Sequence, residues 1–145
     1  MPIQQTPILR DIARQLGNVN KVSLIDERGE ISAVSNGIPQ FDVGEMTDTL
    51  DLCPKSIGIP LMLRSMSPDV IMTDEIADCD VSSIKQILSC GVKIIATAHG
   101  DEILGTIHRI KLDELINEFG CIVLLSKRNG AGTIEKICQG SEIAC

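Results

Sequence analysis

The sequence predicts an α/β domain with a mainly parallel sheet flanked by helices and with an antiparallel hairpin at its C-terminal end. Short apolar runs alternate with helical patterns along the chain, which is typical of parallel sheets. The runs at 70–72 and 93–98 are almost continuously apolar, as expected for strands covered on both faces. A chain of 145 residues with 43% hydrophobic residues suits one domain with one core.

The first half of the chain predicts one helix, one strand and a long loop. Residues 8–16 carry apolar side chains at helical spacing, and a Gly-Asn pair follows where a helix commonly ends. Residues 21–26 form an apolar run that ends in an acid, which predicts a strand. Residues 28–51 are rich in Gly, Ser, Asn, Pro and Thr, include Asn36-Gly37, and predict loop and turns. A loop of this length is often functional.

The second half alternates helices and strands more regularly. Apolar spacing and turn residues predict helices at 57–66, 81–90, 101–109 and 111–118, and strands at 70–73, 92–98, 121–125 and 133–138. Asn129-Gly130 is a strong hairpin pattern within a turn predicted at 127–132. The last two strands are therefore expected to pair with each other.

Composition disfavours several classes of function. The net charge is −7, no Lys/Arg cluster stands out and aromatic residues make up 1%, which argues against direct nucleic-acid binding. No apolar run approaches the about 18 residues that a membrane span needs, and residues 1–15 do not resemble a signal peptide. The six cysteines show no CxxC spacing, so we expect thiols in a reducing cytoplasm and no zinc site.

Two adjacent carboxylates, Asp74 and Glu75, follow the strand predicted at 70–73. Open α/β sheets bind ligands at the carboxyl ends of their strands. In nucleoside triphosphatases of this layout, the first acid holds Mg²⁺ and the second orients and polarises the attacking water. We therefore expect Asp74 to bind the metal and Glu75 to activate water. The alternative is that both acids only favour the N-terminus of the following helix.

Two other strands are predicted to deliver polar groups to the same edge. The first strand is followed by Glu27 and Arg28, and the third contains or precedes Thr97 and His99. We expect Thr97 or His99 to sense a terminal phosphate or hold the attacking water, and Glu27 to be an outer carboxylate of the site. The alternatives are that Thr97 is only a strand-end hydroxyl, His99 only a surface histidine and Glu27 only a solvated loop charge.

Arg28 and Arg64 are candidates for neutralising phosphate charge. A guanidinium group matches phosphate oxygens in a bidentate manner. One of the two arginines is a candidate for action across a subunit boundary, as an arginine finger. The alternative for each is a surface salt bridge.

Six strings of sequence are specific in combination and are spread over nearly the whole chain: LRDIARQL (9–16), LIDERGEI (24–31), GIPQFDVGEMTDTLDLCPK (37–55), LRSMSPDVIMTDEI (63–76), GVKIIATAHG (91–100) and LSKRNGAGTIEKI (125–137). Together they resemble the stage III sporulation AA family, within the secretion-ATPase group of RecA-like P-loop NTPases. The strings DERGEI, RSMSPD and RNGAGTIE are not general features of such ATPases.

The resemblance implies a RecA-like fold and a mother-cell ATPase that uses Mg²⁺ and ATP to support a secretion-like channel to the forespore. It implies Asp74 and Glu75 as the Walker B acids, Glu27 as the upstream acidic box and Arg64 as the arginine before a Pro-Asp pair. It also implies a homo-oligomer such as a hexamer, which is cytoplasmic or peripheral at the membrane facing the forespore. Its partners would be membrane channel components of the sporulation apparatus.

One motif of these ATPases is absent. The GxxxxGK[ST] loop normally stands just before the first helix, and residues 1–7 occupy that place here. Gln4 and Gln5 replace the last Gly and the Lys, while Thr6 stands where a hydroxyl would contact Mg²⁺. Since the phosphate cradle and the lysine charge are missing, we expect this chain to bind ATP weakly or not at all. Residues 1–145 would then be a truncated RecA-like ATPase domain without its P-loop strand.

The missing strand has a structural consequence. In relatives, it would lie between the strands at 94–97 and 122–125. We expect either that these strands close directly on each other, or that their exposed edges pair with another copy.

Two other functions remain open. The chain is also a candidate for a non-catalytic fragment that makes subunit contacts. A receiver-like domain would need a phosphorylatable acid such as Asp74 and a lysine on the last strand, for which Lys127 is a poor match.

Overall fold

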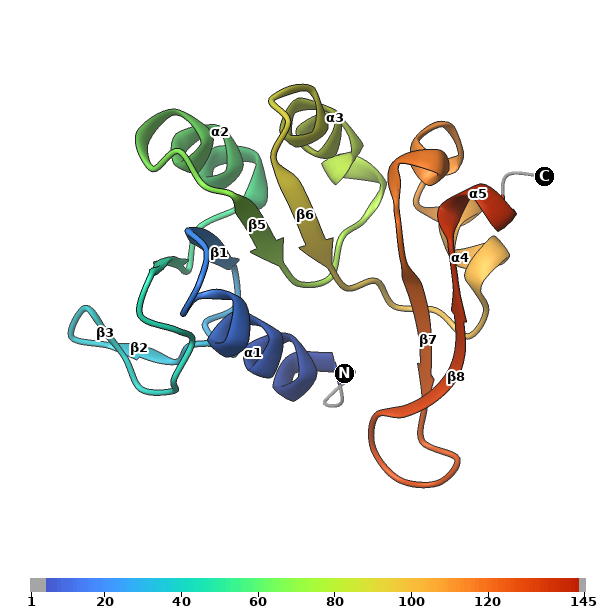
Figure 1. Cartoon of the computed structure of the whole chain (residues 1–145), viewed down its shortest axis with the longest axis horizontal. Helices are drawn as coiled ribbons and strands as arrows, with labels where there is room; N and C mark the ends of the chain where they lie inside the picture. Colours follow the sequence, from blue (N-terminus) through green and yellow to red (C-terminus); the bar gives the residue numbers. More distant parts are fainter. Residues whose placement is uncertain (1–4, 144–145) are drawn as a thin grey trace.

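Four parallel strands form the central sheet of the computed structural model, which describes residues 5–143 (Figure 1). The strand order is β4-β1-β5-β6, and each neighbouring pair is parallel. The strands are β1 (Val22–Asp26), β4 (Thr47–Asp51), β5 (Val70–Thr73) and β6 (Lys93–Ala96). The predicted α/β class with a mainly parallel sheet is confirmed.

Helices cover both faces of this sheet. On one face, α1 (Gln5–Leu16) buries Leu9 and Ala13 against alternate residues of β1 and β5 such as Leu24 and Met72. On the other face lie α2 (Lys55–Ser65) and α3 (Val81–Ser89). They bury Ile59, Met62 and Ile87 against Ile25 and Ile71. Because successive strand residues point to opposite faces, burial on both sides explains the continuous apolar runs.

The segment predicted to be only loop and turns at 28–51 contains a strand of the main sheet, so that prediction was wrong. β4 pairs in parallel with β1, from Val22 opposite Thr47 to Asp26 opposite Asp51. Its sequence TDTLD is polar because β4 is an edge strand with no fully buried residue, and polar edge strands lack the apolar pattern of central ones. Asn36-Gly37 does form a turn, between β2 (Val34–Ser35) and β3 (Ile38–Pro39).

The helices after β5 follow the prediction, with small shifts at their ends. A 3-10 turn, η1 (Asp78–Asp80), precedes α3. After β6 come α4 (Ile103–Arg109) and η2 (Asp113–Glu118), which is a 3-10 helix. No helix within residues 5–143 is long and apolar enough to cross a bilayer.

The C-terminal hairpin forms a sheet of its own. β7 (Ile122–Ser126) pairs antiparallel with β8 (Thr133–Cys138), and α5 (Gly140–Ile143) follows. Direct closure of β6 on β7 was one of two predicted repairs for the missing strand. This pairing does not occur among the described residues, and Figure 1 shows the two strands apart.

The separation of β6 from β7 has a packing cause. Ile122 of β7 and Ile94 of β6 both pack against one cluster that includes Ile107 of α4 and Ile116 of η2, so these helices connect the hairpin to the sheet without pairing the two strands. Both strand edges that face the gap are left without a strand partner among residues 5–143. The strands beside the gap are partly exposed, whereas β1 and β5 are fully buried.

Candidate functional site at the carboxyl edge of the sheet

The ends of three neighbouring strands meet at one edge of the sheet. In the register, Ile25 lies opposite Thr73, and Thr73 lies opposite Ala96. The residues that follow these positions are Asp26, Asp74 and Thr97, so the polar groups expected at this edge are brought together by the parallel pairing.

Asp74 is buried at this edge, with an exposed fraction of 6%. Its Oδ1 atom is inaccessible to solvent and has no hydrogen-bond partner among residues 5–143. Burial raises the pKa of the Asp74 carboxyl, and the charges of Asp26 and Glu75 act in the same direction, whereas the ammonium group of Lys55 opposes the shift. A buried carboxylate oxygen without a partner is costly unless a cation or donor binds it. A cation could satisfy this oxygen, and carboxylate oxygens are the ligands that Mg²⁺ prefers.

Lys55 is the residue of this edge that sequence reasoning missed. It is 5% exposed, and its Nζ atom forms an ion pair with Glu27 and lies 4.0 Å from Asp74 Oδ1. Lys55 begins α2, and a positive charge is unfavourable at a helix N-terminus. The sequence places Lys55 directly after Cys53-Pro54 and before a helical pattern. This unfavourable position could have indicated that a carboxylate compensates the charge of Lys55.

Glu75 is held by contacts from both neighbouring strands. Arg28 donates a hydrogen bond from Nη1 to Glu75 Oε1 over 3.0 Å and forms a salt bridge with the same carboxylate. The Glu75 amide donates to Thr97 Oγ1 at 2.9 Å. Glu75 has a φ of +42°, in the left-handed region that a side chain with a Cβ rarely adopts. Strained residues of this kind often occur at functional sites.

Asp26 anchors the loop that follows β1. It is fully buried, and its carboxylate accepts hydrogen bonds from the amides of Glu30, Ile31 and Ser32 and from the Ser32 hydroxyl. These bonds bend the chain just after Asp26, which positions Glu27 and Arg28 toward Lys55 and Glu75. Asp26 therefore stabilises the loop that carries the site residues. Glu27 and Arg28, which follow it, contact Lys55 and Glu75 directly.

Arg64 and Thr6, two of the expected site residues, contact none of these carboxylates. Arg64 is exposed, donates from Nε to the Pro60 carbonyl at 3.3 Å, and lies about 13 Å along α2 from Lys55. Thr6 lies in the first turn of α1, where the neighbouring Gln5 donates from Nε2 to the Ala98 carbonyl at 3.1 Å. This bond places the start of α1 beside the end of β6. Gln4 lies outside the described residues.

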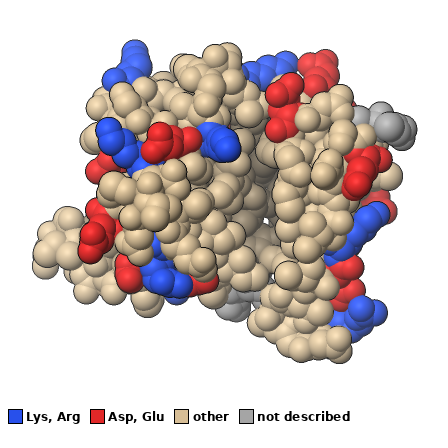
Figure 2. Space-filling view, viewed as in Figure 1, with Lys and Arg blue, Asp and Glu red and all other residues tan. Residues whose placement is uncertain are grey.

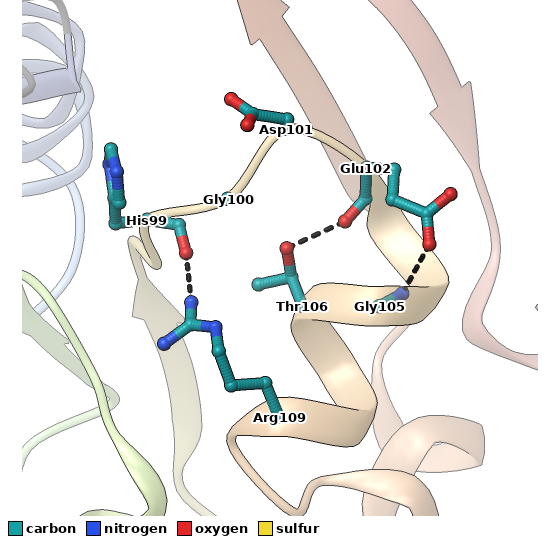
Figure 3. A pocket seen from close by; sticks show the side chains of 7 residues that line it. All are labelled: His99, Gly100, Asp101, Glu102, Gly105, Thr106 and Arg109. Carbon is teal, nitrogen blue, oxygen red and sulfur yellow. Dashed lines mark hydrogen bonds between the residues drawn. The ribbon is translucent and has the colours of Figure 1, made fainter.

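His99 belongs to a separate pocket (Figure 3). Arg109 donates to the His99 carbonyl, and the His99 ring points away from Arg109. Glu102 caps α4 by accepting from the Gly105 amide at 2.8 Å, and the Thr106 hydroxyl donates to the Glu102 carbonyl at 2.6 Å. These hydrogen bonds are local and cap the start of α4, which has seven residues. The pocket is therefore formed by the turn that leads into this helix.

No group of three or more His, Cys, Asp or Glu side chains within residues 5–143 is arranged to hold a metal ion. The described cysteines, at 53, 79, 90, 121 and 138, are all free.

The sequence was compared with protein families and with curated proteins. Residues 2–143 match the model of the family described as sporulation stage III, protein AA. The chain belongs to this family. The stage III sporulation protein AA of Bacillus subtilis (strain 168) is 39% identical over 142 residues, covering 92% of this chain and 46% of that protein. The chain therefore spans about half the length of this protein AA relative. No solved structure matches the chain significantly.

Proposed function

We propose that this chain is the Mg²⁺- and water-handling part of an ATPase that acts in sporulation. The observation that carries the proposal is the buried Asp74 oxygen, which has no hydrogen-bond partner in the described part of the chain. It lies at the carboxyl edge of a parallel sheet, where ligands of such sheets bind, and it is followed directly by a second carboxylate. Membership of the sporulation family supports the cellular process.

Asp74 is the residue that would hold Mg²⁺, directly or through water. Its oxygen chemistry suits a hard cation, and the absence of a larger ligand cluster among the described residues suits an ion that retains waters and phosphate oxygens. When bound, Mg²⁺ would neutralise charge on the ATP phosphates. Thr6 lies in the first turn of α1, which starts beside the end of β6. Its hydroxyl group is the second protein group that we propose as a contact of Mg²⁺.

Glu75 is the proposed residue for orienting and polarising the attacking water. Its carboxylate is partly exposed, so water can reach it, while Arg28 and Thr97 hold its side chain and backbone. Thr97 Oγ1 already accepts from the Glu75 amide, so its proposed role is to place Glu75. Arg28 would turn from Glu75 to phosphate when nucleotide binds.

The proposed assembly is a cytoplasmic homo-oligomer, with a hexameric ring as the form that puts sites at subunit boundaries. Arg64 is exposed and far along α2 from the carboxylates, which suits a role toward a neighbouring subunit. The exposed His99 is a weaker candidate for a phosphate sensor. Membrane channel components of the sporulation apparatus are the proposed partners. The proposal includes no nucleic-acid partner, because the net charge is −7, and Figure 2 shows acidic and basic side chains interspersed on one face.

The decisive experiment uses this chain and a version extended upstream through a GxxxxGK[ST] loop. Calorimetry should detect little Mg-ATP binding by the 145-residue chain, and the extended version should hydrolyse ATP. Asp74→Asn and Glu75→Gln should each lower kcat by about 100-fold or more, as for loss of key charge-stabilising groups. Asp48→Asn, at an exposed position of β4, is the matched control. Unchanged hydrolysis in both site variants would refute the assignment.

A second candidate function is that of a non-catalytic fragment that makes subunit contacts. The facing edges of β6 and β7 favour it, because no strand among the described residues 5–143 pairs with them, and Figure 2 shows a hollow between the two parts of the molecule that carry them. Exposed strand edges readily accept a further strand, here one from a second copy. Sedimentation velocity over a range of concentrations should show association together with slower amide exchange in both strands. A monomer at all concentrations would contradict this candidate.

A further inference from the structure

Lys55 places a positive charge between two carboxylates of the candidate site. Its ammonium group is almost completely buried and forms a close ion pair with Glu27, whose side chain is 39% exposed. Toward Asp74 the distance is 4.0 Å, which is within ion-pair reach but too long for a hydrogen bond. The attraction to Asp74 is therefore purely electrostatic, and Asp74 Oδ1 keeps its unshared electron pairs.

The two contacts of Lys55 have different consequences for a metal ion. The bond to Glu27 fixes the ammonium group at the start of α2. From there its charge acts on the oxygen of Asp74 that a metal would bind. A divalent cation at this oxygen would be repelled by Lys55, because both carry positive charge at short distance in a poorly solvated place.

We propose that Lys55 is a positioning residue that serves as the built-in counter-cation of Asp74 and makes the site select the metal–nucleotide complex over the free metal ion. A free divalent cation has to compete with the Lys55 charge. A complex of the metal with a nucleoside triphosphate brings its own negative charge, so the repulsion is offset. This inference rests on the proposed function, since it takes Asp74 as the metal-binding residue.

The test measures binding of Mn²⁺ alone to the ¹⁵N-labelled chain, through paramagnetic broadening of the Ile76 and Thr97 amide signals. The wild-type chain should bind weakly, and Asp74→Asn should bind more weakly still. Lys55→Met removes the charge and should bind about tenfold more tightly, as expected for a unit charge about 5 Å from a divalent ion even in water. Lys55→Arg keeps the charge and should resemble the wild type.

Lys85→Met is the matched control, because it removes the charge of an exposed lysine that pairs with Glu114 at 3.2 Å on the surface. It should leave Mn²⁺ binding unchanged. Lys55→Gln is a second charge-free variant in case Lys55→Met folds poorly, and circular dichroism checks both. If neither charge-free variant folds, Lys55 is needed for the fold itself and the proposal is overturned.

The outcomes separate this inference from the proposed function. If Mn²⁺ binding depends on Asp74 but both charge-free variants bind no more tightly than the wild type, only the role of Lys55 is wrong. If Mn²⁺ broadens no signal near Asp74 in any variant, the metal site fails and the inference fails with it. With the extended protein, free Mn²⁺ should inhibit the hydrolysis of Mn-ATP more strongly in Lys55→Met than in the wild type.

Discussion

The backbone amide of Glu75 donates a hydrogen bond to the side-chain hydroxyl of Thr97 at 2.9 Å, and so ties the ends of β5 and β6 together. The next amide, that of Ile76, donates to the Thr97 carbonyl at 2.8 Å. Thr97 thus holds two consecutive residues beyond the end of β5. This explains how Glu75 keeps an unusual backbone conformation at the edge of the sheet.

Replacing Thr97 by Val should remove the acceptor while keeping the shape of the side chain. The Glu75 amide would then lack its partner in a partly buried place, and the free energy of unfolding should fall by about 1–2 kcal/mol. Thr97→Ser keeps the hydroxyl and should lose less. Urea unfolding measures the stabilities, and amide exchange at Glu75 should become faster in the Val variant alone. Equal stabilities for Val and Ser would show that the bond contributes little.

The positive φ of Glu75 predicts an unusual order of stability for two substitutions. Glu75→Ala and Glu75→Gly both lose the ion pair with Arg28, so their difference reports on the backbone. The Gly variant should be the more stable by about 1 kcal/mol, because only glycine adopts this region without a Cβ clash. At Glu114, which has no positive φ, the Ala variant should be the more stable. Thermal unfolding of the four variants tests this reversal.

The raised pKa of Asp74 predicts a pH-dependent effect of Asp74→Asn. The folded state binds the Asp74 proton more tightly than the unfolded state, so the ionised carboxylate destabilises the fold. This cost vanishes only well below about pH 4, the ordinary pKa range of Asp, where both states are protonated, and it is complete above the raised pKa. Asp74→Asn should therefore gain stability relative to the wild type as pH rises from 3.5 to 7. The gain in the free energy of unfolding is larger the further burial raises the pKa of Asp74.

Urea unfolding at several pH values measures the effect of Asp74→Asn. Asp48→Asn, which changes an exposed carboxylate on β4, serves as the control and should show little such trend. A stability difference that stays constant between acid and neutral pH would contradict the burial of an ionised Asp74.

Asp26→Asn should destabilise the loop after β1. The Asn side chain has an NH₂ group, which only donates, in place of one carboxylate oxygen that accepts from the backbone amides of Ile31 and Ser32. The free energy of unfolding should therefore fall by about 2–3 kcal/mol. Ser32→Ala removes only the hydroxyl bond at 2.7 Å and should cost about 1 kcal/mol. Amide exchange at Ile31 and Ser32 should accelerate in Asp26→Asn. Retained protection there would show that other contacts hold the loop.

Much of the candidate site could be predicted from the sequence. Asp74 and Glu75 follow an apolar run that is buried on both faces, and parallel pairing brings strand ends to one edge. Glu27, Arg28 and Thr97 were expected at the same edge for the same reason, and they contact Lys55, Glu75 and the Glu75 amide, respectively. Lys55 was missed because it comes from a helix start, where no strand periodicity points to it.

The sequence by itself determined most of the helices, the strands β1, β5, β6, β7 and β8, the two-sided burial of β5, and the carboxylates that follow β1 and β5, because these follow from local apolar spacing. Only the tertiary structure decided that polar β4 joins the sheet, that Lys55 reaches Glu27 and Asp74, and that the hairpin packs on α4 and η2 away from β6. Such pairings join segments far apart in the chain. Their free energy depends on which surfaces meet, and local periodicity contains no record of that.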